Sequence, residues 1–317
     1  MATPIITDGT MERVVEAPRV VTPVLQSVFA DRATRFEQLA RDHAMADFLM
    51  LMSRIAQAQH AIVGRRQPPA LPAAALEHSR EYGMPPASAL SHERAASWQQ
   101  DLADLLVECE ALGVTARQLE ASRVLDGAAC EALADRILAG TTLDADAAAV
   151  PFVGAALQVY FARLAASIEV GTVADFDVAT VCPVCGTRPV ASVVRIGGDR
   201  NNLRYLVCAL CSSEWNVARI KCSACEQDKG VHYLSLTAAG DAGPQSEPAR
   251  NESGVAAARR AEACDECKSY LKIFYQEKDP YVDATADDLA SLALDMLVDE
   301  QGFGRSGPNL LFHPGST

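Results

Sequence analysis

The sequence predicts an α+β protein in which an all-α N-terminal domain is followed by two tandem four-cysteine ribbon modules and a C-terminal helix. Three observations predict this order. Apolar residues recur at helical spacing in the first half, the period then changes to strand alternation, and four Cys-x-x-Cys pairs fall in that second region. We expect a helical domain over residues 20–172, ribbons over 181–221 and 222–280, and a helix with a tail over 281–317.

The first half of the chain predicts helices that are separated by a proline-rich break. Two sets of apolar residues follow a helical period: Val24, Val28, Ala30, Phe36 and Leu39, then Phe48, Leu49, Met52, Ile55, Ala58 and Ile62. Prolines at positions 68, 69, 72, 85 and 86 interrupt the pattern, with room for one or two helical turns over residues 73–82. Further helices are expected over residues 91–112, 119–138 and 147–168.

From residue 181 the pattern predicts hairpins. Residues 190–196 alternate up to the turn signal Gly197-Gly198-Asp199, and residues 203–207 form a return strand that leads into Cys208. The same order repeats with a strand at 232–236, a polar loop at 237–253, a returning strand near 255–261 and a strand at 270–275. Each hairpin therefore brings two cysteine pairs together.

Eight cysteines form the candidate metal sites: Cys182, Cys185, Cys208, Cys211, Cys222, Cys225, Cys264 and Cys267. A two-residue gap lets both sulfurs of a pair face one ion, and two such pairs complete a tetrahedral site. The hairpins favour joining the first pair to the second and the third to the fourth. An interleaved cross-brace, which joins the first pair to the third, is the alternative. We predict two metal ions per chain.

The chemistry of these sites favours a structural ion or an electron carrier, because four thiolates leave no open coordination position for metal-assisted hydrolysis. Tetrahedral sulfur suits zinc and mononuclear iron alike, and iron would add redox activity. The chain carries no H-E-x-x-H, G-x-S-x-G or Walker motif. A G-x-G-x-x-G string at residues 302–307 follows a helix and not a strand, so it is expected to be a tail loop. We predict that the protein is not an enzyme.

Four other residues near or outside these sites are expected to be structural. Cys109 and Cys130 stand alone in predicted helices, where a thiol acts as a small apolar side chain. Trp215 is expected to cover the core of the first ribbon. His232 is expected to pack or face solvent, since four sulfurs already complete each site.

Charge and hydropathy restrict the partners. A net charge of -13 and a pI near 4.9 argue against a nucleic-acid partner, because phosphate binding needs a basic surface. The first twenty residues show no secretory signal, and no run of about 18 uncharged apolar residues predicts a membrane span. We therefore expect a cytoplasmic protein whose reduced thiols bind metal.

The C-terminal region predicts one helix. Thr285-x-x-Asp288 resembles a capping box, and Leu289, Leu292, Ala293, Met296 and Leu297 share one face. The opposite face carries Asp287, Asp288, Asp295, Asp299 and Glu300. A solvated surface is the expectation for these acids, with a partner-binding strip as the alternative.

Several short stretches carry a family resemblance: Cys182-Pro183-Val184-Cys185-Gly186, Leu203-Arg204-Tyr205-Leu206, Glu214-Trp215, Lys221-Cys222-Ser223-Ala224-Cys225, Tyr270-Leu271-Lys272 and Asp287-Asp288-Leu289-Ala290-Ser291-Leu292. The chain resembles the FdhE formate dehydrogenase accessory proteins, most specifically from Cys182 to Phe312. The resemblance implies rubredoxin-like ribbons beside a helical domain, with iron at the cysteine sites. It also implies a cytoplasmic protein that is needed for formate dehydrogenase activity and that binds the catalytic subunit before export.

Two positions depart from the family pattern. Asn216 stands where the family often has histidine, so no role of that histidine transfers to this chain. The loop from Thr237 to Ser253 is longer and richer in Gly, Pro and Ser than the resemblance implies. Neither departure changes the eight cysteines.

We interpret the chain as a maturation factor for formate dehydrogenase, with iron favoured over zinc by the resemblance. The first alternative is a rubredoxin-like iron electron carrier that acts during maturation. The second is a zinc-ribbon module that binds nucleic acid, which the acidic balance disfavours. The sequence indicates no oligomeric state.

Overall fold

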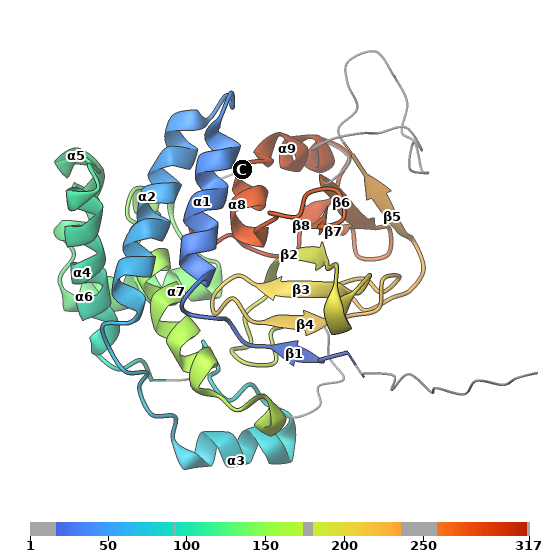
Figure 1. The fold of residues 1–317 in the computed structure, drawn as a ribbon, viewed down its shortest axis with the longest axis horizontal. Helices are drawn as coiled ribbons and strands as arrows, with labels where there is room; N and C mark the ends of the chain where they lie inside the picture. Colours follow the sequence, from blue (N-terminus) through green and yellow to red (C-terminus); the bar gives the residue numbers. More distant parts are fainter. Residues whose placement is uncertain (1–16, 92, 174–179, 236–258, 316–317) are drawn as a thin grey trace, which may run out of the picture.

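Most helices lie in the first half of the chain and most strands in the second, as the sequence predicts. The computed structural model describes residues 17–91, 93–173, 180–235 and 259–315. A layer of helices lies beside one twisted sheet, and α1 and α8 occupy the boundary between them (Figure 1). The predicted polar loop at 237–253 and most of the predicted strand at 255–261 lie outside the described residues, as do residues 1–16.

Seven α-helices make up the described helical half. They are α1 (Val28–Ala40), α2 (Ala46–Val63), α3 (Ala73–Tyr82), α4 (Ser97–Ala111), α5 (Ala116–Arg123), α6 (Gly127–Ala139) and α7 (Val150–Ser167). The predicted single helix over 119–138 is wrong, because a new start signal interrupts it. Asp126 accepts a hydrogen bond from the amide of Ala129 at 2.8 Å and caps α6, three residues after α5 ends.

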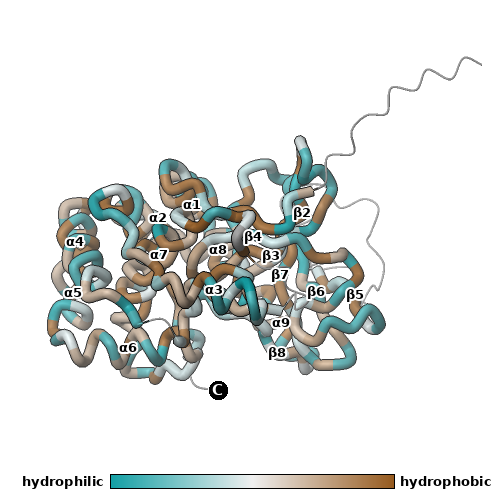
Figure 2. Tube along the Cα trace, turned by 90° about the horizontal axis from the view of Figure 1, so that it is seen from below, coloured by the Kyte–Doolittle hydropathy of each residue, from teal (hydrophilic) through white to brown (hydrophobic). Residues whose placement is uncertain are grey.

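The helix α7 forms the centre of the helical core. It is long and apolar enough to cross a membrane by length and composition alone, but 83% of that stretch is buried inside the protein. Figure 2 shows hydrophobic stretches along α7 and the central strands, while the peripheral α3 is largely hydrophilic. Arg163 in α7 is paired with the buried Asp101, which compensates its charge. The apolar character of α7 therefore reflects a buried helix that α2, α4 and α6 surround.

One sheet runs through both predicted ribbons. Its strands are β1 (Val20–Val21), β2 (Pro189–Val194), β3 (Arg204–Cys208), β4 (Glu214–Asn216), β5 (Val231–Leu234), β6 (Arg259–Cys264), β7 (Ser269–Tyr275) and β8 (Gly304–Arg305). The order is β1-β4-β3-β2-β7-β6-β5, and β8 also pairs with β7. The parallel pair of β2 and β7, with Ser192 opposite Ile273, joins the two hairpins. The mixed α+β class is confirmed, while the division of the ribbons at residue 221 stays a prediction.

Two apolar cores lie against this sheet. The larger core contains the helical residues together with the first hairpin, including Trp215 and the first four cysteines of the chain's ribbon region. The smaller core lies under the second hairpin and consists of Ala261, Ala263, Tyr270, Leu294, Val298 and Phe303. The first hairpin therefore shares its core with the helices, whereas the second hairpin packs on α9 (Leu292–Glu300).

The single C-terminal helix and its capping box at Thr285 are wrong. The chain forms α8 (Ala284–Leu289) and then α9, and the cap is Asp283, which accepts a hydrogen bond from Ala286 at 2.8 Å. The ammonium of Lys272 donates to the carbonyls of Asp288 and Ser291, at 2.8 and 3.1 Å. Lys272 thus binds carbonyls on both sides of the break, one near the end of α8 and one at the N-cap of α9.

The predicted faces of the C-terminal region are also wrong in part. Met296 and Leu297 are exposed, and Leu294 and Val298 are buried in their place. Asp287 and Asp288 are fully buried, so the solvated acidic surface does not include them. Asp299 and Glu300 are exposed as expected.

Buried ion pairs explain the acidic residues. Arg35 of α1 binds Asp287 through two nitrogens, at 2.8 and 2.7 Å, and Asp279 at 2.5 Å. Arg259 of β6 reaches the same Asp287 carboxylate at 3.0 Å. We call these four residues, Arg35, Arg259, Asp279 and Asp287, the junction network. It connects the helical layer to the C-terminal half by charge-assisted hydrogen bonds.

Candidate metal centres

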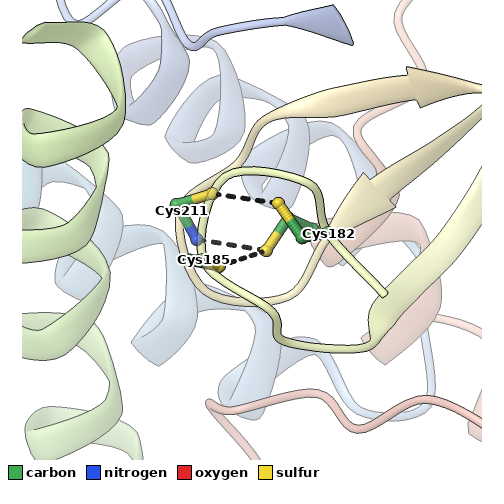
Figure 3. Close-up of side chains that lie close together, drawn as sticks. Cys182, Cys185 and Cys211 are labelled. Atoms are coloured by element: carbon green, nitrogen blue, oxygen red, sulfur yellow. Dashed lines mark hydrogen bonds between the residues drawn. The ribbon is translucent and has the colours of Figure 1, made fainter. Parts of the chain in front are cut away.

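The cysteines of the first two Cys-x-x-Cys pairs form a buried cluster, which we call the first cluster: Cys182, Cys185, Cys208 and Cys211. Their relative exposures are 0%, 0%, 1% and 0%. The Sγ atoms of Cys182 and Cys211 are 3.6 Å apart, and those of Cys185 and Cys208 are 3.3 Å apart. The side chains of Cys182, Cys185 and Cys211 converge between two loops (Figure 3).

The cysteines of the last two Cys-x-x-Cys pairs form the second cluster: Cys222, Cys225, Cys264 and Cys267. The Sγ atoms of Cys222 and Cys267 are 3.8 Å apart, and those of Cys225 and Cys264 are 3.7 Å apart. Cys267 is exposed and Cys225 is half-buried. The sulfurs are thus grouped as the tandem hairpins predict, and the cross-brace does not occur.

Each cysteine pair sits in a tight turn, which we call a knuckle. The amide of Gly186 donates to the carbonyl of Cys182 at 2.8 Å, and the amide of Val184 donates to the Cys182 sulfur at 3.4 Å. Forty residues later, the amides of Glu226 and Ala224 make the same two bonds to Cys222, at 3.1 and 3.4 Å. The repeated bonds fix the sulfur positions.

The residue after each knuckle adopts a left-handed backbone. The φ angles are +75° at Gly186, 59° at Ser212, 63° at Glu226 and 51° at Lys268. Glycine adopts this conformation without the steric cost that a Cβ atom imposes. One of the four positions is glycine, so the familiar Cys-x-x-Cys-Gly signal reveals the first knuckle and not the other three.

The geometry of both clusters fits a metal ion. In a tetrahedron with metal–sulfur bonds of about 2.3 Å, the sulfur–sulfur edges are about 3.8 Å long. All four sulfurs of each cluster lie within 4.8 Å of one another. The two clusters could therefore hold two ions. Such an ion would have four sulfur ligands and no exchangeable position, which suits a structural or electron-transfer role.

Burial and hydrogen bonds shift the pKa values of the clustered thiols in both directions. Burial raises the pKa of Cys182 well above the ordinary thiol value, and hydrogen bonds with the three neighbouring thiols raise it further. Burial acts in the same direction on Cys267, but hydrogen bonds with Ser269 and Cys225 outweigh it and lower the pKa of Cys267 to about 7. A bound cation stabilises thiolates directly, so it would offset the desolvation cost in the first cluster.

The remaining cysteines and aromatic residues lie where the sequence predicts. Cys109 and Cys130 are buried in α4 and α6, and burial raises the pKa of Cys109 to about 12, which makes it an inert thiol. Trp215 is buried in the larger core. His232 is half-buried, packs edge-on against Phe303 at 5.5 Å, and belongs to neither cluster.

The sequence reasoning missed several polar residues that support the first cluster. Gln158 of α7 donates to the carbonyl of Ala209 at 2.9 Å, and Arg32 of α1 donates to the hydroxyl of Ser212 at 3.2 Å. Both side chains come from helices whose buried faces are mostly apolar, although Arg35 of α1 and Arg163 of α7 are also buried. A polar residue at a helix position where the period predicts a buried apolar one was the signal that could have revealed them.

The fold and its clusters define a class of protein in which a helical domain is fixed to a sheet that carries two closed four-cysteine centres. The chain belongs to the FdhE family. Family models of the FdhE N-terminal, central and C-terminal domains match residues 17–176, 181–219 and 220–312. The resemblance that the sequence analysis found is therefore confirmed.

Individual relatives agree with this assignment. The chain is 40% identical over 320 residues to the Protein FdhE homolog of Pseudomonas aeruginosa, with 99% of each chain covered. It is 36% identical over 301 residues to Protein FdhE of Salmonella typhimurium, with 94% of this chain and 92% of the relative covered. It also resembles the crystal structure of the P. aeruginosa FdhE protein, with a TM-score of 0.78 at 38% identity over 94% of this chain and all of that one.

Proposed function

We propose that the protein is a non-enzymatic maturation factor that formate dehydrogenase requires for activity. It binds the catalytic subunit in the cytoplasm through the half of the sheet that the metal ions organise. Membership of the FdhE family along the whole chain is the observation that carries this proposal. Two closed four-cysteine clusters support a binding role, because neither offers a position at which a substrate could reach the metal.

The charge of the chain agrees with a protein partner. A net charge of -13 disfavours the phosphate backbone of a nucleic acid. The metal ions act by fixing the knuckles, since the binding free energy of a structural ion is coupled to folding. The half of the sheet that forms the interface therefore needs its ions.

Binding of the catalytic subunit is expected to depend on the second cluster. A variant with serine at Cys222, Cys225, Cys264 and Cys267 should bind the purified subunit at least about tenfold more weakly, because the knuckles lose their ion and their fixed shape. Calorimetric titration of the subunit with each chain measures this loss. A variant with alanine at Cys109 and Cys130 is the matched control, and it should bind as the wild type does.

Circular dichroism must show that the helices of the four-serine variant remain folded. If this variant binds the subunit at the wild-type level and restores formate oxidation in a deletion strain, the metal sites do not organise the interface. The proposal would then be wrong in its central point.

The second candidate function is an iron electron carrier that acts during maturation. Exposure of Cys267 favours it, because a sulfur at the surface of a mononuclear iron site gives an electron a short path to a partner. The carrier needs iron that cycles between its ferrous and ferric states, whereas a purely structural ion does not. Iron is the metal that we propose for both clusters, with zinc as the alternative.

Protein purified without oxygen from iron-supplied cells is expected to turn red on oxidation. Ferric ion bound to four thiolates absorbs visible light by sulfur-to-metal charge transfer, and zinc, with a filled d shell, does not. An absorption spectrum and metal analysis of the same sample measure this. A colourless protein with about two zinc ions per chain would remove both the iron assignment and the electron carrier.

A further inference from the structure

The two clusters differ in what surrounds them. The cysteines of the first cluster are at most 1% exposed and belong to the same apolar core as the helices. In the second cluster Cys267 is exposed and Cys225 is half-buried, and the nearby core lies under α9. Two sites with the same ligands therefore occupy different structural positions, one between the halves of the protein and one at the far side of the sheet.

Both knuckles of the first cluster accept hydrogen bonds from the helical half. The amides of Ala87 and Ala89 donate to the carbonyls of Val184 and Cys185, at 3.0 and 2.8 Å. From the other side, Gln158 donates to the carbonyl of Ala209 at 2.9 Å. Arg32 completes the set through the hydroxyl of Ser212 at 3.2 Å. We call these four donors, Arg32, Ala87, Ala89 and Gln158, the clasp.

The clasp holds atoms that the knuckles position. Val184 and Ala209 lie between the two cysteines of their pairs, and Cys185 is itself one of the cysteines. The acceptor atoms therefore move whenever a knuckle loses its shape. The donor Gln158 is held independently of the cluster, because it is 1% exposed and is also bonded to Gln59 and Arg32. The buried donor Gln158 thus has partners of its own in the helical half and faces an acceptor whose position depends on the cluster.

The hydrogen bonds described at the second cluster reach strands and loops of the sheet, including β3 of the first hairpin, and not the helical half. The amide of Asp265 donates to the carbonyl of Gly230 at 3.0 Å, and the amide of Gly304 donates to the carbonyl of Lys268 at 2.8 Å. Arg204 of β3 donates to the carbonyl of Lys221, just before the first knuckle of this cluster, at 2.7 Å. Loss of shape here loosens the β5–β7 hairpin and β8 before it affects the helices.

We propose that an ion in the first cluster fastens the helical domain to the sheet through the clasp, while an ion in the second cluster organises only its own hairpin. Binding equilibria at two coupled sites are reciprocal, so a fastened clasp also strengthens ion binding in the first cluster. These different roles of the two ions follow from the clasp contacts, and they do not require the formate dehydrogenase partner.

Stepwise removal of the ions from the full-length protein tests the proposal. The protein is incubated with EDTA and pulsed with N-ethylmaleimide, and mass spectrometry measures the labelling of each cysteine. Amide hydrogen exchange of residues 87–90 is followed in parallel. The second cluster is expected to be labelled first, with the Ala87 and Ala89 amides still protected. Labelling of the first cluster should then coincide with the loss of that protection.

Two outcomes would overturn the proposal. Labelling of Cys182 and Cys185 while Ala87 and Ala89 keep their protection would show that the ion does not hold the clasp. If that protection is lost when only the second cluster is labelled, the ion that fastens the helical domain is not the one in the first cluster. Metal analysis before the experiment separates these results from a chain that binds no metal, which would instead contradict the metal part of the proposed function.

A substitution in the clasp tests the reciprocal effect. Gln158→Ala removes one donor and changes no cysteine, and it should lower the EDTA concentration that releases the first-cluster ion by about tenfold. Release from the second cluster should not change. Asn309→Ala is the matched control, because Asn309 is also a buried amide but bonds to Thr285 and Asp288. Equal effects of both substitutions on the first cluster would contradict the clasp.

Discussion

Replacement of Cys182 and Cys185 by serine is expected to reduce the metal content from about two ions per chain to about one. The second cluster keeps all four of its sulfurs and should keep its ion. The lost ion removes on the order of 10 kcal/mol of apparent binding free energy that is coupled to folding, which is similar to the whole stability of a domain. Metal analysis and thermal unfolding followed by circular dichroism measure both effects.

The double serine variant should also unfold at a lower temperature than the wild type. Because the first cluster shares a core with the helices, its loss removes support from both halves of the protein. Alanine at Cys109 and Cys130 controls for the loss of thiols as such, and it should leave about two ions bound. A double serine variant that still binds two ions, or that melts as the wild type does, would contradict the assignment of the ligands.

The sequence predicted the features that depend on short-range pattern. The second helix follows its apolar period and spans Ala46–Val63. A helix also lies at residues 73–82 between the prolines, although its ten residues exceed the one or two turns predicted there. The grouping of the cysteines followed from two hairpins, each of which returns one pair beside its neighbour. In both cases the information lies within a few residues or one turn of the chain.

Features that depend on long-range contacts could not be predicted. The strands β1, β4 and β8 have two or three residues each, too few to show an alternating pattern, and they exist because a neighbouring strand pairs with them. The parallel pair of β2 and β7 joins residues about eighty positions apart. The local sequence pattern contains no signal for these short strands or for the pairing of β2 with β7.

The acidic C-terminal residues show the same limit for charge. A pattern of acids opposite an apolar face usually indicates a solvated surface. Here Asp287 is fully buried because its partners come from α1, about 250 residues earlier, and from β6. The charge pattern was present in the sequence, but the arginines that pair with Asp287 and allow its burial are distant in the chain.

Asp287→Ala is expected to lower the free energy of unfolding by about 3–5 kcal/mol, because it leaves the buried Arg35 and the half-buried Arg259 without their shared carboxylate. Arg35 has 5% relative exposure and would keep Asp279 as its acid partner, while Arg259 would lose its bonds to Asp287. The amide of Asp283 would lose its acceptor as well, at the start of α8. Chemical unfolding of the metal-loaded protein measures the change.

Two further variants separate the buried charge from the loss of a side chain. Asp299→Ala removes an exposed acid from the next helix, and its effect should stay within about 0.5 kcal/mol. Asp287→Asn keeps the shape of the side chain without its charge, so it should remain clearly destabilising, because neutral hydrogen bonds to arginine are weaker than charge-assisted ones. If Asp287→Ala and Asp299→Ala prove equally mild, the junction network does not hold the helical layer to the sheet. If Asp287→Asn matches the wild type, the charge of Asp287 is not what stabilises the junction.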